Sequence, residues 1–230
     1  MHRKALAIDE KAFGKDHPHV ATDLNNLALA LAAQGRYADA EPLYQRAIKI
    51  NESALGPEHP DLAGNLNNEA DMLRMEGKLA DAEPLYRRAL KIKETTLSPE
   101  DLSIATTLDG LAATLREQWN FTDAEAFARR ALSIRQKVLP ANDPDTAASF
   151  NNLAMVLVAE QLYPEAESMF GRAENILEHG PSPHYQNLAG VLRNHAEGLR
   201  KQGRYMEAGI IAHRADEAER NARILRGRNH

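Results

Sequence analysis

The sequence predicts an all-α protein, built as a solenoid of helix-turn-helix repeats. Three observations support this fold class. An internal repeat keeps a constant period of 42 residues, each copy carries two apolar stripes with helical spacing, and residues that stop and start helices recur at the copy boundaries. A pair of helices cannot bury both of its apolar faces alone, so neighbouring copies have to stack on one another.

The repeat is defined by two landmarks. The first reads LNNLA from Leu24 and recurs, with substitutions, from residues 66, 108, 150 and 192. The second reads GRYADAEPLYQRA from Gly35 and recurs from residues 77, 119, 161 and 203. We therefore expect one domain over residues 1–226, followed by a tail at 227–230. Within it we expect a half repeat at 1–16 and full repeats at 17–58, 59–100, 101–142, 143–184 and 185–226.

Each repeat is expected to contain two helices. In the first full repeat Leu24, Leu27, Ala28 and Leu31 follow the spacing of one helical stripe, and Gly35 ends that helix. The second stripe contains Ala40, Leu43, Tyr44, Ala47, Ile48 and Ile50. Its small alanines allow two helices to cross closely, and large residues such as Tyr44, Tyr86 and Phe170 are expected to fill the gaps between repeats.

The repeat boundaries carry helix stop and start signals. Leu55-Gly56-Pro57 is expected to end a second helix, because glycine tolerates the left-handed cap and proline cannot continue a helix. His59-Pro60-Asp61 restarts the chain, with proline suited to the first helical position. We expect His17 and His59 to cap their helices.

The two ends of the chain differ from the inner repeats. Residues 3–16 align with the second helix of a repeat, so this segment is either part of a longer array or a lone helix that caps the N-terminal end. The last helix, at about 206–224, turns polar at Asp216, Glu217, Glu219, Arg220 and Arg223. Terminal repeats need a wetted outer face, so we expect a C-terminal cap there.

Composition excludes several classes of function. Hydrophobic residues make up 43% and charged residues 27%, which is typical of a folded soluble protein. The net charge of −5 gives no basic face for nucleic acid, and no apolar run of about 18 residues is present to span a membrane. The chain has no cysteine, so we expect a cytoplasmic protein.

The repeat residues resemble a known family. Leu24, Leu27, Ala28, Gly35, Tyr37, Ala40, Tyr44 and Ala47 match the tetratricopeptide pattern position by position. The 42-residue spacing and the wording HPD…LNNLA…G.Y..AE.LY.RAL are similar to the kinesin-light-chain subclass, over roughly residues 1–218. The resemblance implies a right-handed superhelix whose first helices line a concave groove.

The resemblance also implies which side chains face a ligand in this groove. They are Asn25, Asn26, Leu29, Asn67, Asn68, Asp71, Arg74, Asp109, Arg116, Asn151, Asn152, Met155, Arg193, Asn194, Glu197 and Arg200. Asparagine is unfavourable inside helices, so its recurrence needs a reason. Its amide both donates and accepts hydrogen bonds, which suits holding the backbone of an extended peptide. Alternatively, one Asn of each pair bonds a neighbouring helix and holds the stack together.

Charged residues in the groove allow two further hypotheses. Some members of the wider family bind a C-terminal carboxylate with clustered basic residues, and here Arg193, Arg200 and Lys201 could do so; the alternative is a solvated face with pairs inside one helix. Glu69 and His195 stand in the packing stripe where other repeats have leucine. An unpaired buried carboxylate is costly, so we expect Glu69 to pair with Arg46 or Arg88.

The sequence therefore favours a protein-interaction scaffold that binds a peptide or protein segment in the groove. The alternative is a self-associating architectural segment of a larger repeat-containing signalling protein, forming a homo-oligomer through the half repeat. No phosphate-binding loop, nucleophile elbow or HExxH motif is present, so we expect no enzyme activity and no cofactor. The nine histidines show no metal-ligand spacing, and we expect Trp119 to cover a helix-helix corner.

Overall fold

All secondary structure in the described part of the chain is helical. The computed structural model describes residues 2–180 and 184–228. Its helices are α1 (His2–Phe13), α2 (Pro18–Ala32), α3 (Tyr37–Leu55), α4 (Pro60–Glu76), α5 (Leu79–Thr96), α6 (Leu102–Glu117), α7 (Phe121–Val138), α8 (Pro144–Ala159), α9 (Tyr163–His179), α10 (Tyr185–Lys201) and α11 (Tyr205–Arg228). The predicted all-α fold class is confirmed.

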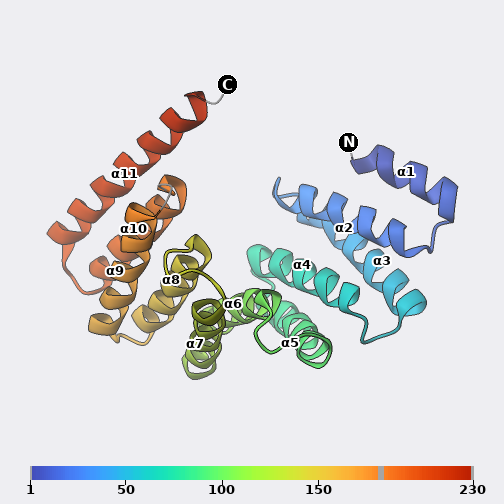
Figure 1. Cartoon of the computed structure of the whole chain (residues 1–230), viewed down its shortest axis with the longest axis horizontal. Helices are drawn as coiled ribbons and strands as arrows, with labels where there is room; N and C mark the ends of the chain where they lie inside the picture. The colour runs from blue at the N-terminus through green and yellow to red at the C-terminus, as the bar shows by residue number, and fades with distance from the viewer. Residues whose placement is uncertain (1, 181–183, 229–230) are drawn as a thin grey trace. The chain divides into compact units, whose positions relative to one another are not determined.

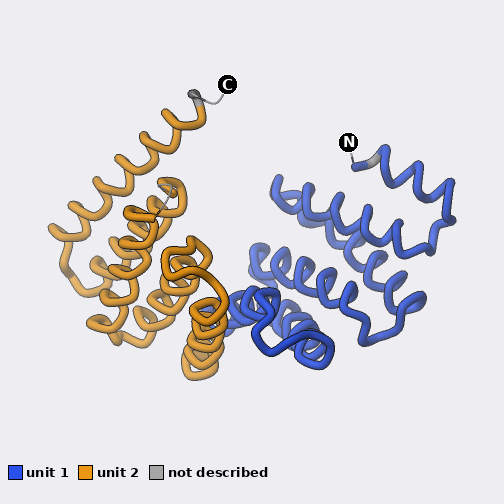
Figure 2. The backbone as a smooth tube through the Cα atoms, in the orientation of Figure 1, with its two compact units in different colours: residues 1–118 blue, residues 119–230 orange. Residues whose placement is uncertain are grey.

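The chain forms two compact units, residues 1–118 and 119–230 (Figure 2). The first contains α1 to α6 and the second α7 to α11. Inside each unit consecutive helices pack as pairs, for example α2 with α3 and α10 with α11 (Figure 1). First helices of successive repeats also touch, α2 with α4 and α4 with α6 in one unit, and α8 with α10 in the other. That all five repeats form a single domain stays a prediction.

Small and large residues divide the core as the repeat predicts. Ala28, Ala40 and Ala47 are fully buried, so α2 and α3 approach closely. Tyr44, Tyr86 and Phe170, at one shared repeat position, are among the largest side chains that are fully buried.

The first helices α2, α4, α6 and α8 begin with side-chain caps, whereas α10 has none. The Nδ1 atoms of His17 and His59 accept hydrogen bonds of 3.2 Å from the backbone N–H groups of residues 19 and 61, which confirms the predicted histidine caps. Asp101 and Asp143 take the same position with a carboxylate, each accepting a 2.8 Å bond from the N–H two residues on. Each cap satisfies one backbone donor that the helix itself leaves unpaired.

The turn inside each repeat uses a left-handed backbone. Gly35, Gly77 and Gly203 have positive φ there, and so do Trp119 (φ 66°) and Gln161 (φ 64°). Trp119 was expected to cover a helix-helix corner, but it is 80% exposed and its ring lies 5.9 Å from that of Phe121. The backbone of the turn holds the side chain outward, so this expectation is wrong.

The half repeat leaves an apolar residue on the surface. Ile8 of α1 is 65% exposed, whereas Ile50, at the same repeat position, is 4% exposed. Ile50 packs against Val20, Ala21 and Leu24 of the first helix in its own repeat. Within the described residues no first helix packs on Ile8 in this way. Asp216, Glu217, Arg220 and Arg223 are exposed along α11, as expected, but Met206, Ile210 and Ile224 of the same helix are exposed too, so the surface of this helix is not uniformly polar.

Candidate functional site

The predicted groove residues lie on the first helices of the repeats. Those from Asn25 to Arg116 belong to α2, α4 and α6 of the first unit, and those from Asn151 to Arg200 belong to α8 and α10 of the second. We call these two surfaces the first-helix faces. Asn26, Leu29, Arg193, Glu197 and Arg200 are exposed. The remaining predicted residues are half-buried, apart from Asn67, which is buried.

Four of the predicted asparagines bond to one another. Asn68 Nδ2 donates to Asn25 Oδ1 at 3.1 Å, and Asn194 Nδ2 donates to Asn151 Oδ1 at 3.0 Å. In both pairs the second Asn of one repeat donates to the first Asn of the repeat before it. Of the two hypotheses for the Asn pairs, the structural one therefore applies to these four. Each amide keeps polar atoms that this bond does not use, because an amide has two donor hydrogens and an acceptor oxygen.

Asn67 and Asp71 belong to an interior network instead of an open groove. Asn67 is 7% exposed, accepts a 2.8 Å bond from Thr107 Oγ1 and donates a 3.0 Å bond to Asp71. Lys93 Nζ donates to Thr107 Oγ1 at 2.7 Å, and the Tyr86 hydroxyl donates to Asp71. Burial raises the pKa of Asp71, and the hydrogen bond from Tyr86 opposes that rise. Asn67 is thus buried and Asp71 half-buried in this network, and that either of them faces a ligand stays a prediction.

Most basic groups on the first-helix faces already have acidic partners. Arg74 and Arg116 both lie 3.2 Å from Glu117. Arg193 pairs with Glu219 of α11 at 2.5 Å, and Lys201 lies 3.6 Å from Glu197 on its own helix. Two of the three residues expected to clamp a carboxylate are thus engaged: Lys201 within its own helix, as the alternative expected, and Arg193 with a different helix.

A groove of about 170 Å³ lies between α8, α9 and α10 in the second unit. Its lining residues are Pro144, Ala148, Asn151, Leu177, Asn187, Gly190, Val191 and Asn194. The sequence predicted Asn151 and Asn194 but missed the neighbouring Ala148, Asn187 and Gly190. These three precede the predicted pair by one or two helical turns, so helical spacing could have found them. Small residues beside three amides let the backbone of a ligand approach closely.

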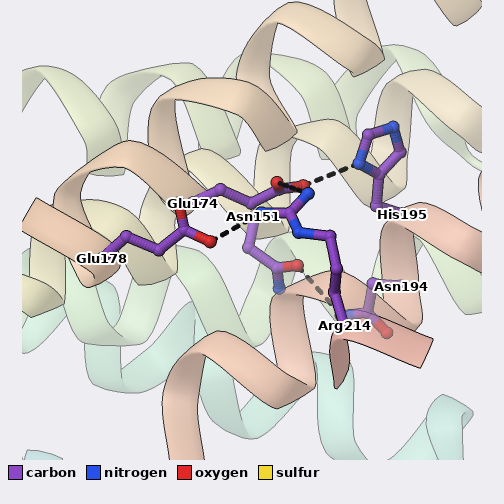
Figure 3. A network of polar contacts seen from close by, with 6 residues as sticks. All are labelled: Asn151, Glu174, Glu178, Asn194, His195 and Arg214. Atoms are coloured by element: carbon purple, nitrogen blue, oxygen red, sulfur yellow. Dashed lines mark hydrogen bonds and ion pairs between the residues drawn. The ribbon is translucent and has the colours of Figure 1, made fainter. Parts of the chain in front are cut away.

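His195 takes part in a buried polar network (Figure 3). Its Nδ1 atom lies 2.7 Å from Glu174 Oε1, and its ring stacks on Phe170 with 5.0 Å between centroids. Arg214 of α11 donates to Glu174 at 3.0 Å and to Glu178 at 2.6 Å. Glu174 itself stands where other repeats have Ile48, Leu90 and Leu132. Two polar substitutions in the packing stripe therefore satisfy each other.

Glu69 does not form the ion pair predicted for it. Arg46 pairs with Glu10 at 2.8 Å and Arg88 pairs with Glu52 at 2.5 Å, so both expected partners are occupied. Glu69 is 6% exposed, and burial, with a smaller effect of the Glu41 charge, raises its pKa to about 7. The buried carboxyl is kept partly neutral instead of paired.

The described residues also bear on metal binding and on membrane insertion. Within residues 2–180 and 184–228, no group of three or more His, Cys, Asp or Glu side chains is placed to hold a metal ion. In the same part of the chain, no helix combines the length and apolar character needed to cross a bilayer.

The comparison with known families decides the affiliation of the repeats. The sequence model of the tetratricopeptide repeat family matches residues 1–53, 21–95 and 103–179. The chain belongs to the tetratricopeptide repeat family. Among curated proteins, none matches this tetratricopeptide repeat chain significantly.

Solved structures of kinesin light chain-like repeat proteins share the fold. A kinesin light chain-like protein with nearly identical repeats from Podospora anserina is 19% identical, with a TM-score of 0.73 over 90% of this chain and 98% of its own. BtubC (BKLC) from P. vanneervenii is 21% identical, with a TM-score of 0.76 over 96% of this chain and 88% of its own. YrrB, described as a tetratricopeptide repeat protein with an unusual peptide-binding site, is 17% identical, with a TM-score of 0.53 over 98% of both chains.

Proposed function

We propose that this tetratricopeptide repeat protein is an interaction scaffold that holds an extended segment of a partner protein in the groove between α8, α9 and α10. The observation that carries the proposal is the combination of Asn151, Asn187 and Asn194 with the small residues Ala148 and Gly190 in one groove. Amides supply donors and acceptors for a peptide backbone, and each such bond contributes about 1 kcal/mol.

Membership of the family supports binding over catalysis. Tetratricopeptide repeat proteins generally act as interaction scaffolds, and YrrB has a peptide-binding site by its own description. The lack of cysteine fits action in the cytoplasm, where thiols stay reduced.

Gly190 offers a clean way to block the groove. A Cβ atom added at Gly190 meets nothing within 4 Å, so a larger side chain fits the fold and fills the groove. Gly209 of α11 is a matched control, because a Cβ there also meets nothing within 4 Å and Gly209 does not line the groove. Peptides selected from a random library on the wild-type chain are then titrated against Gly190→Leu and Gly209→Leu. The proposal expects loss of binding in Gly190→Leu alone; equal binding by both variants rejects the groove.

Self-association through α1 is a second candidate, and the 65% exposure of Ile8 favours it. An uncovered isoleucine on a helix that lacks its usual neighbour can bury itself against a second copy. Sedimentation velocity over a range of concentrations tests this, with Ile8→Glu as the variant expected to stay monomeric. A wild-type sedimentation coefficient that does not change with concentration rejects it.

A further inference from the structure

An ion pair recurs between the second helices of neighbouring repeats. In every case an arginine contacts a glutamate that lies 36 residues earlier in the chain. The pairs are Arg46–Glu10 at 2.8 Å, Arg88–Glu52 at 2.5 Å and Arg214–Glu178 at 2.6 Å. The sequence keeps arginine at this position in every full repeat.

One repeat breaks this series. Arg172 of α9 occupies the arginine position, but Gln136 stands where the glutamate belongs. Within the described residues no carboxylate replaces it, and the Arg172 guanidinium instead lies over the Phe150 ring, 5.5 Å from its centroid. Arg172 is exposed, so its charge is open to a ligand from outside.

A second irregularity falls at the same place. Thr146 of α8 stands where other repeats have Val20, Leu62, Ile104 and Leu188. Its side chain is shorter than leucine or isoleucine, it is 2% exposed, and its hydroxyl has no hydrogen-bond partner among the described residues. Buried hydroxyls normally find partners, so an orphaned one points to a missing group.

The two irregularities share one cavity. It has a volume of about 280 Å³ and lies between the end of α7, α8 and α9. Gln136, Thr146, Phe150, Arg172 and Ile176 line it, together with the loop residues Pro140 and Ala141. Asn175 lines it too, so apolar and polar side chains share its walls, and the polar groups include the Arg172 guanidinium and the unpartnered Thr146 hydroxyl.

We propose that this cavity binds an acidic side chain of a partner protein, presented next to an apolar residue. The carboxylate takes the place of the glutamate that Gln136 lacks and receives the charge-assisted hydrogen bonds of Arg172. The second oxygen of the carboxylate accepts the hydrogen bond that the Thr146 hydroxyl lacks, and the apolar neighbour packs against Phe150 and Ile176. This site is separate from the groove between α8, α9 and α10, since the two share no lining residue.

Two end-blocked peptides test the proposal, one with adjacent leucine and glutamate and one with glutamine in place of the glutamate. Chemical-shift mapping on the full chain is expected to show the glutamate peptide at Thr146, Phe150 and Ile176, and to show about tenfold weaker binding of the glutamine peptide. Equal binding of the two peptides overturns the proposal. So does stronger binding of a peptide whose only carboxylate is its C-terminus.

Two variants locate the effect. Gln136→Glu restores the ion pair of the other repeats, so it is expected to occupy Arg172 and abolish peptide binding while the chain stays folded. Ser53→Glu adds the same charge at an exposed position of α3 and is expected to bind like the wild type. Arg172→Gln should remove the preference for the glutamate peptide. A preference that survives in both Gln136→Glu and Arg172→Gln contradicts the proposal.

Discussion

The buried carboxyl of Glu69 makes stability depend on pH in a defined direction. Glu69 is 6% exposed and its pKa is raised from 4.5 to about 7, first by burial and then by the charge of Glu41. Between these two pH values the folded chain holds a proton that the unfolded chain has lost. The free energy of unfolding therefore falls as the pH rises through this window, and the loss is complete above the folded pKa.

The size of this effect follows from the shift in pKa. A change from 4.5 to about 7 corresponds to about 3 kcal/mol of lost stability above that window. Glu69→Gln keeps the shape of the protonated carboxyl and cannot ionise. We expect it to be about 3 kcal/mol more stable than the wild type near pH 8, and close to the wild type near pH 4.

Urea unfolding followed by circular dichroism, at several pH values between about 4 and 8, measures the difference directly. Glu58→Gln is the control, because it makes the same chemical change at an exposed position. If Glu69→Gln were instead less stable than the wild type near pH 8, Glu69 would be an ion-paired carboxylate and the reasoning would be refuted.

Four further substitutions test the packing. Glu174→Leu should cost about 2 kcal/mol, because it removes the partner of His195 and one of the two carboxylates that bind Arg214. His195→Leu should cost less, because Arg214 still donates to Glu174. The double variant should cost less than the sum of the two losses, and a double variant that shows that sum contradicts the coupling. Gln161→Gly should raise the free energy of unfolding by about 1 kcal/mol, because Gln161 has a positive φ, which glycine adopts without the steric cost of a side chain. Thermal unfolding measures this change, and a lower melting temperature would argue against backbone strain at this position. Gly110→Ala should cost about 1–3 kcal/mol, since its Cβ would lie 2.5 Å from the Tyr86 ring, and unchanged urea unfolding would show that this ring can move aside.

The helices could be predicted from the sequence because their signals are local. The 42-residue period, the Gly35 turn and the His17 and His59 caps all depend on residues close together in the chain. A signal of this kind has the same consequence wherever its residues recur. For this reason the fold class and the family followed from the pattern alone.

The use of individual polar side chains could not be predicted in the same way. Asn25 can either face a ligand or bond to Asn68, and the way in which α2 and α4 cross decides between the two. The residue pattern of a single helix does not predict this crossing. Asn67 is buried because Thr107, 40 residues later, reaches its amide. The partner of His195 could not be predicted for a similar reason, because Glu174 belongs to the preceding repeat and lies 21 residues earlier in the chain.

The break in the ion-pair series can be recognised from the sequence. Aligning the repeats places Gln136 among glutamates and Thr146 among apolar residues, so both departures are visible without coordinates. What the alignment lacks is that they meet at one cavity beside Arg172, which requires the packing of α7, α8 and α9.

Binding of a partner segment in the groove between α8, α9 and α10 can be measured by NMR spectra of the side-chain amides. A peptide selected on the wild-type chain is added to isotope-labelled protein, and the amide signals of Asn151, Asn187 and Asn194 are followed. We expect these three signals to shift in parallel as the peptide saturates the protein, and we expect Gly190→Leu to abolish the shifts. Saturable binding that leaves the three amides unchanged, with shifts confined to other helices, would contradict it.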